Sequence, residues 1–202
     1  MHRKIHEMRI AEFINTRSRA PKRGTVAVAV GWCRLGDLLL DSGELWIGDP
    51  QMSWAESREH GGCIVRLRAG RYRVSFGLVT FGQGLFTSRL RVCQQGIRQV
   101  TVGKELGQVG TDSAQIGVCD IRAIKRAYEI AFPDYDEAFA YFDKNLKPRA
   151  GILRPNGQRG ACLPFVESGF GDGMGPVVEL RSGAKRVGVD AEFIPDSYAY
   201  ST

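Results

Sequence analysis

Residues 166–193, VESGFGDGMGPVVELRSGAKRVGVDAEF, contain the signals that decide the fold class. Glycine occupies every second position from Gly169 to Gly175, and two apolar runs follow around a Ser-Gly turn at 182–183. Glycine adopts backbone conformations with positive φ at little cost, and two β-type runs around such a turn are typical of an antiparallel hairpin. The stretch therefore predicts a glycine-rich turn, with candidate loop positions Gly169, Gly171, Gly173 and Gly175, that leads into a final hairpin.

The same pattern of short β-type runs separated by turn residues is present in the first half of the chain. TVAVAV (25–30) reads as a strand, LLLDSGELWIGDP (38–50) as a hairpin around Asp41-Ser42-Gly43, and CIVRLRAGRYRVSFGLVTF (63–81) as a second hairpin around Ala69-Gly70. LFTSRLRVC (85–93) follows as another strand after a Gly-Gln-Gly turn. Strands this close together, without crossover helices between them, predict antiparallel sheets.

Helical periodicity occurs in one part of the body. Ile121, Ile124, Tyr128 and Phe132 share a helical face, with Asp120 as the predicted N-cap. A second helix is expected to begin at Asp134 or Asp136 and to carry Phe139, Phe142 and Leu146. Residues 147–166 are predicted to be a loop that contains one short apolar stretch. The prediction is a β-rich α+β fold, an antiparallel sandwich or open barrel with two inserted helices.

Charge is unevenly distributed along the chain. The formal net charge is +6, but residues 1–24 alone carry seven basic residues against two glutamates. We therefore expect a basic N-terminal helix or leader over 1–24 and a single, nearly neutral β-rich domain over 25–202. A nearly neutral body argues against a polyanion surface across the domain, although the leader could contact phosphate.

The cysteines and the hydropathy indicate the compartment. Five cysteines without any C-x-x-C pair fit neither a disulfide framework nor a zinc site, and each lies in or beside an apolar segment. No apolar run approaches the roughly 20 residues that a membrane span needs. We expect a soluble cytoplasmic protein with free thiols and no membrane span.

Acidic residues at turns and strand ends are the candidate ligands. Asp112, Asp120 and Asp172 are the inner candidates, and Asp49 and Asp190 the outer ones. Converging carboxylates would bind a divalent cation or act as an acid and base pair. Each also fits a structural role: Asp120 as a helix cap, Asp49 as a turn former before proline, and Asp172 as an Asx turn before glycine.

Other motifs are weaker. A phosphate cradle requires a helix after the glycine loop, whereas Pro176-Val177-Val178 predicts a strand. His2 and His6 have a helical metal-ligand spacing at a chain terminus, and His60 lies in a polar run typical of a surface loop. Pairs of arginines two residues apart would lie on one strand face, where they would be either solvated or available to single-stranded nucleic acid: Arg66 and Arg68, Arg71 and Arg73, Arg89 and Arg91.

Four short motifs resemble the bacterial domain-of-unknown-function family numbered 4241. They are SGELWIGDP, GTDSAQIGVCD, SGFGDG and the closing GVDAEF, which together span about Asp37 to Phe193. The chain departs from the family pattern at Met174-Gly175, where an aromatic residue is expected, and in its basic leader. The resemblance implies a mostly β domain without an established activity. Its motif residues in this sequence are Asp49, Asp112, Asp120, Gly171, Asp172, Gly173 and Asp190.

The sequence favours a non-enzymatic binding or interaction module that uses the face around the glycine loop. Its partner would be a protein or a small molecule, and no cofactor is expected. The alternatives are a metal-dependent hydrolase built on Asp112, Asp120 and Asp172 with a divalent cation, and a nucleic-acid-binding protein that uses the leader or the arginine strands. The nearly neutral body argues against nucleic acid as the partner.

Overall fold

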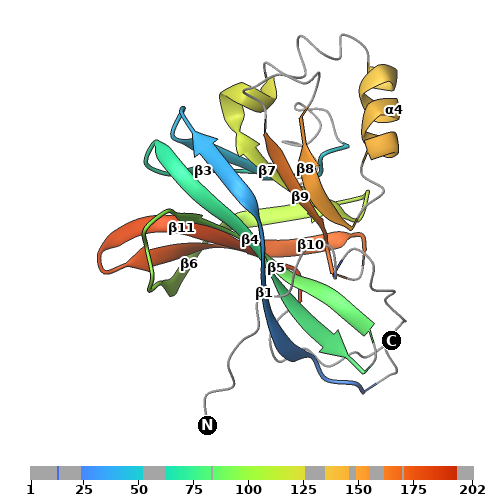
Figure 1. The fold of residues 1–202 in the computed structure, drawn as a ribbon, viewed down its shortest axis with the longest axis horizontal. Helices are drawn as coiled ribbons and strands as arrows, with labels where there is room; N and C mark the ends of the chain where they lie inside the picture. Colours follow the sequence, from blue (N-terminus) through green and yellow to red (C-terminus); the bar gives the residue numbers. More distant parts are fainter. Residues whose placement is uncertain are drawn as a thin grey trace.

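A computed structural model describes residues 13, 24–51, 62–82, 84–125, 135–145, 149–154, 162–169 and 171–194. Two antiparallel sheets make up most of this part of the chain (Figure 1). The larger sheet has six strands in the order β1-β4-β5-β11-β10-β6, and the smaller has five in the order β3-β2-β7-β9-β8. The predicted β-rich α+β sandwich is confirmed.

The strands are long in the large sheet and short in the small one. The large sheet consists of β1 (Val28–Leu40), β4 (Gly70–Phe81), β5 (Gly84–Gln94), β6 (Thr101–Thr111), β10 (Gly173–Ser182) and β11 (Lys185–Glu192). The small sheet consists of β2 (Glu44–Gly48), β3 (Cys63–Arg66), β7 (Gln115–Asp120), β8 (Ala150–Leu153) and β9 (Leu163–Glu167).

The two hairpins predicted at 38–50 and 63–81 are wrong. β1 pairs with β4 and β2 pairs with β3, so neither turn joins neighbouring strands of one sheet. Instead, the chain passes from one sheet to the other at 41–43 and back at 67–69, and the two crossings are joined by a hydrogen bond from the Leu67 amide to the Gly43 carbonyl (2.9 Å). Gly43 has φ +73°, as a left-handed turn residue requires, but the turn makes a corner between two sheets.

A second ribbon bends in the same way. β6 pairs with β10 in the large sheet, and β7 pairs with β9 in the small one. The crossings contain residues 112–114 and the described residues 168, 169, 171 and 172, and they are joined by a hydrogen bond from the Ser168 amide to the Ala114 carbonyl (2.9 Å). We call residues 41–43 with 67–69 the first corner, and residues 112–114 with 168, 169, 171 and 172 the second corner.

Two predicted hairpins are confirmed. Phe81 pairs with Gly84 at the tight turn between β4 and β5, and Ser182 pairs with Lys185 at the turn between β10 and β11. The loop predicted for 147–166 is wrong in part, because β8 and β9 pair with each other within it. The short runs around Ala150 and Leu163 are buried, so tertiary packing makes strands of segments whose flanking prolines indicate a loop.

The helices lie in the insertion between β7 and β9. Residues 121–125 are helical, and α4 (Tyr135–Asn145) confirms the second predicted helix. α4 lies next to β8 (Figure 1), and its buried Phe142 belongs to an apolar cluster with Trp46 and Phe165. The rest of the first predicted helix, with Tyr128 and Phe132, lies outside the described residues.

The main core lies between the two sheets and includes one residue of the predicted leader. Phe13 is fully buried, its ring centroid lies 5.0 Å from that of Phe76, and the Arg149 guanidinium lies over it. The histidine pair at positions 2 and 6 lies outside the described residues, as does His60.

The described cysteines are free, as predicted. Cys33, Cys63 and Cys119 are buried, and burial raises the pKa of the Cys63 and Cys119 thiols. Among the described residues, no helix has the length and apolarity that a membrane crossing needs.

Candidate functional site

Asp49, at the end of β2, holds the second corner. Its buried carboxylate accepts hydrogen bonds from the Thr111 hydroxyl (2.8 Å), the Asp112 amide (2.9 Å) and the Ser113 amide (2.8 Å). The Ser113 hydroxyl donates a further bond of 2.6 Å, and the Gln51 amide one of 2.9 Å. Both carboxylate oxygens of this turn-forming residue are therefore occupied by hydrogen bonds within the protein.

Asp120, at the end of β7, holds the first corner in the same way. Its Oδ2 accepts from both the amide and the hydroxyl of Ser42, each at 2.7 Å. Its Oδ1 accepts from the amides of Arg122 (2.9 Å) and Ala123 (3.2 Å), so Asp120 is the predicted N-cap of the helix that follows. The side chain is 3% exposed and serves two structural roles.

The two corners belong to a sequence repeat. DSGELWIGD (41–49) and DSAQIGVCD (112–120) begin and end on aspartate, share serine at the second position, and match Gly with Ala, Glu with Gln, Leu with Ile, and Ile with Val. The backbone conformation is similar in the two copies as well, because Ala114, which matches Gly43 in the repeat, also has a positive φ of +58°. Each final aspartate binds the serine of the other copy.

The pairing of the strands follows the same relationship. β2 and β7 pair antiparallel, and Ile47 pairs with Val118, which occupies the same place in the repeat. In the large sheet, the order of equivalent strands is the same from either edge when β1 is matched with β6, β4 with β10 and β5 with β11. The body is therefore two similar halves related by an approximate two-fold axis, with the helices and β8 inserted in the second half.

The three inner aspartates of the sequence prediction do not lie together. Asp112 and Asp172 are exposed and each lies one residue beyond the last β6–β10 pair, Thr111 with Gly173. Asp120 is at the far end of β7, five residue steps along the strand from Gln115, which is roughly 17 Å at the usual rise. Within the described ranges, no group of three or more His, Cys, Asp and Glu side chains could hold a metal ion.

Asp190, the remaining outer candidate, is paired with an arginine. Its fully buried carboxylate accepts from Arg91 Nε (2.8 Å) and Nη2 (2.6 Å). Arg89 pairs with Glu192 (3.0 Å) one step further along the same strands. Because Leu90 and Ala191 pair between them, the two ion pairs are related by the approximate two-fold axis. The predicted arginine pair on β5 is therefore neutralised by β11.

The alternating glycines from Gly169 to Gly175 lie partly in a turn and partly in a strand. Gly169 (φ +66°) and Gly171 (φ +116°) have backbone conformations that favour glycine, and the Ser168 hydroxyl closes the turn on the Gly171 carbonyl (2.7 Å). Gly173 and Gly175 lie in β10. A methyl group on Gly175 would be 1.9 Å from the Glu192 carbonyl oxygen, whereas one on Gly173 would meet nothing within 4 Å.

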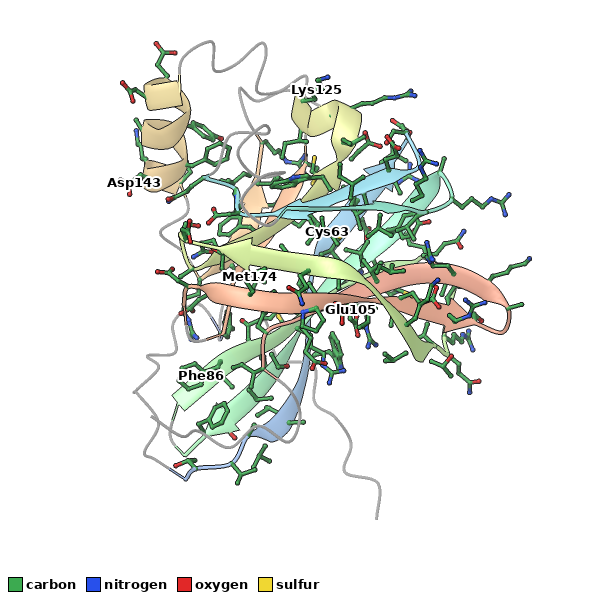
Figure 2. All side chains as sticks on the ribbon, turned by 180° about the vertical axis from the view of Figure 1, so that it is seen from behind. Cys63, Phe86, Glu105, Lys125, Asp143 and Met174 are labelled. Atoms are coloured by element: carbon green, nitrogen blue, oxygen red, sulfur yellow. The ribbon has the colours of Figure 1, made fainter. Side chains whose placement is uncertain are left out.

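A cavity of about 200 Å³, the corner cavity, opens at this turn. Its apolar wall is formed by Val109, Ile116 and Phe193, and the Met174 side chain, 69% exposed, stands at its border near the end of the β6–β10 pair (Figure 2). Thr111, Ser168 and Asp172 contribute the polar part. The cavity therefore combines an apolar wall with one exposed carboxylate at its rim.

The first corner is filled at the equivalent positions. The strand register matches three leucines of the first half with residues of the second half: Leu38 with Val109, Leu40 with Thr111, and Leu67 with Ser168. Leu38 and Leu40 are 2% and 0% exposed, and Leu67 packs against the core. The second half has a shorter side chain at each of these places, and its crossing strand contains two additional residues. The corner cavity therefore lies where the two halves differ.

Sequence reasoning about the candidate loop located the cavity but missed most of its wall. Val109, Ile116 and Phe193 are ordinary strand residues in the sequence, so only the pairing of β6, β7 and β11 identifies them. The repeat of nine residues is the signal that could have identified the two corners as equivalent.

Comparison of the chain with protein-family models, with curated proteins and with solved structures finds no match. The resemblance to the family numbered 4241 stays a prediction. Function is therefore inferred from the geometry of the site.

Proposed function

We propose that this protein is a non-enzymatic interaction module that takes one side chain of a partner into the corner cavity. The observation that carries the proposal is the difference between the halves: the second corner is hollow where the first is filled by leucines. Proteins tend to fill such openings, because apolar side chains that face water at an opening lose part of the stabilisation of burial. A cavity at the second corner, where the equivalent positions of the first corner are filled, is therefore a candidate for use.

The size and lining of the cavity favour a particular kind of guest. Its volume of about 200 Å³ is below the usual range of about 300–1,000 Å³ for pockets that enclose small-molecule ligands. An aliphatic chain would pack on Val109, Ile116 and Met174, and a positive end group would meet Asp172 at the rim, with Asp112 nearby. We propose a lysine-like side chain of a partner protein as the guest.

The test is an NMR titration of the ¹⁵N-labelled protein with n-butylammonium, using n-butanol as the neutral control. We expect saturable shifts of the Gly171, Asp172 and Gly173 amides with the amine, and weaker shifts with the alcohol. Gly173→Phe should abolish them, because its side chain would extend from open space across the cavity. Val102→Phe, at an exposed position of β6, is the matched control. Equal responses in the two variants would refute the proposal.

The metal-dependent hydrolase remains an alternative because Asp112 and Asp172 flank the same strand pair. Two carboxylates are a minimal set of hard oxygen ligands. A rise in melting temperature with calcium, magnesium or manganese that Asp172→Asn removes would favour this alternative, since a ligand specific to the native state stabilises it.

A further inference from the structure

A second cavity, of about 300 Å³, lies on the other face of the large sheet. Its lining comes from β1, β4 and β5, including Trp32, Gly77, Ser88, Arg89 and Arg91. Arg89 and Arg91 alternate along β5 with the buried Leu90 and Val92, so these arginines lie on the side of the sheet away from the main core. We call this space the sheet pocket.

Arg91 is held in a fixed orientation at this pocket. Its guanidinium lies 4.1 Å from the centroid of the Trp32 ring, while its Nε and Nη2 donate to Asp190. Burial acts to lower the pKa of Arg91, but the hydrogen bond and charge of Asp190 outweigh it and raise the pKa. A fork of this kind leaves Nη1 as a further donor, and Nη1 makes no hydrogen bond within the described part of the chain.

Ser88 provides a second, independent polar group. It is 4% exposed, and its hydroxyl lies 3.0 Å from the place that a Cβ on Gly77 would occupy. Its carbonyl accepts two backbone hydrogen bonds, but its hydroxyl has no partner among the residues that the structure describes. This hydroxyl is not one of the fully enclosed polar atoms without a partner, so it is open to the pocket, where a guest could accept a hydrogen bond from it.

The charges around the sheet pocket favour an anion. The carboxylates that neutralise Arg89 and Arg91 belong to β11, and no acidic side chain among the described residues lines the pocket. A guest bound on the β1–β4–β5 side therefore lies closer to the guanidinium groups than to their carboxylate partners. A carboxylate could accept from both Arg91 Nη1 and the Ser88 hydroxyl, while Trp32 offers a flat apolar surface.

We propose that the sheet pocket binds a small organic carboxylate, whose charged group contacts Arg91 and Ser88 and whose flat apolar body packs on Trp32. The volume of the pocket is at the lower end of the range for small-molecule sites, which limits the guest to about one ring. This site is separate from the corner cavity and does not depend on the function proposed for it.

The probe for this site is benzoate, with benzamide as its neutral isostere. The ¹⁵N-labelled protein is titrated with each, and the indole resonance of Trp32, assigned with Trp32→Phe, is followed. We expect a saturable shift with benzoate and binding of benzamide at least about tenfold weaker, because the amide cannot form the charge-assisted bonds. No saturable shift with benzoate, or equal affinity for the two probes, would overturn the proposal.

Two variants locate the binding without altering the ion pairs. Ser88→Ala removes the hydroxyl and should weaken benzoate binding about threefold to tenfold. Ser182→Ala, in the turn between β10 and β11, is the matched control and should leave affinity unchanged. Folding of both variants is checked by their amide spectra. If Ser88→Ala binds benzoate as tightly as Ser182→Ala does, the proposed site is wrong.

Discussion

Asp49 and Asp120 link the two halves of the molecule in a reciprocal way. Each aspartate is the last residue of one copy of the nine-residue repeat, and it accepts hydrogen bonds from the serine at the second position of the other copy. Ser113 donates to Asp49 by its amide and hydroxyl, and Ser42 does the same to Asp120. The two corners are thereby fixed relative to the central strands β2 and β7. Both aspartates act in the architecture of the protein.

Replacing Asp49 by asparagine should destabilise the protein by about 2 kcal/mol, because the buried amide cannot satisfy all five donors and loses the charge that strengthens them. Urea denaturation measures the effect. Asp112→Asn, at an exposed position of the same corner, should change the free energy of unfolding by less than about 0.5 kcal/mol. Equal effects of the two substitutions would contradict the role assigned to Asp49.

The alternating glycines of the second corner should respond differently to alanine. Gly175→Ala places a methyl group 1.9 Å from the Glu192 carbonyl oxygen and should cost more than about 2 kcal/mol. Gly173→Ala meets nothing within 4 Å and should cost less than about 1 kcal/mol. Thermal unfolding of both variants tests this, and a smaller loss for Gly175→Ala would refute the close approach of β10 to residue 192.

Exchanging one pair of equivalent residues tests the difference between the corners. Leu38→Val removes a methylene from a filled core and should cost about 1 kcal/mol. Val109→Leu adds one at the wall of the corner cavity and should change stability by less than about 1 kcal/mol, because space is present there. The same Val109→Leu variant should bind n-butylammonium more weakly. Calorimetric unfolding together with the NMR titration measures both effects, and a cost for Val109→Leu well above that for Leu38→Val would exclude the open space.

Stability should depend on pH through Glu179. The hydrogen bonds from Arg181 and Arg186 hold the pKa of Glu179 at about 2, below the ordinary value of about 4.3 in an unfolded chain. A carboxyl whose folded pKa is depressed stabilises the protein above its unfolded pKa, and this contribution is lost as the pH falls from about 4.3 to about 2.

Glu179→Gln should therefore flatten the decline of the free energy of unfolding over that pH range, measured by urea denaturation at several pH values. Glu105→Gln, at an exposed position on the neighbouring β6, serves as the control and should retain the decline. A pH profile of Glu179→Gln that matches the profile of this control would show that the arginine contacts do not act on the carboxyl.

The sequence was sufficient for the fold class because alternation and turn composition are local properties. The Ser-Gly hairpin, the helix of 135–145 and the cap at Asp120 depend only on neighbours in the chain, and each is confirmed. The turn at Asp41-Ser42-Gly43 was misassigned as a hairpin because the same residues form a corner between sheets. Only the partner of β1, which is β4, decides between the two.

The candidate site was harder to predict because it depends on contacts between distant residues. The carboxylates of Asp49 and Asp120 are bound by groups 62 to 64 and 78 residues away, respectively. No pattern along the chain distinguishes a carboxylate that binds a ligand from one that binds a distant turn. The prediction of turn and cap roles is confirmed for Asp49 and Asp120, whereas the exposed Asp112 and Asp172 remain candidates.

The exchange of serine contacts between the halves also affects how the chain folds. Neither half contains the carboxylate that completes its own corner, so loss of structure in one half removes hydrogen bonds from the other. Contacts between residues so far apart in sequence form late and slowly, since the intervening chain must first be closed into a loop. The two halves should therefore fold and unfold as one cooperative unit, despite their resemblance.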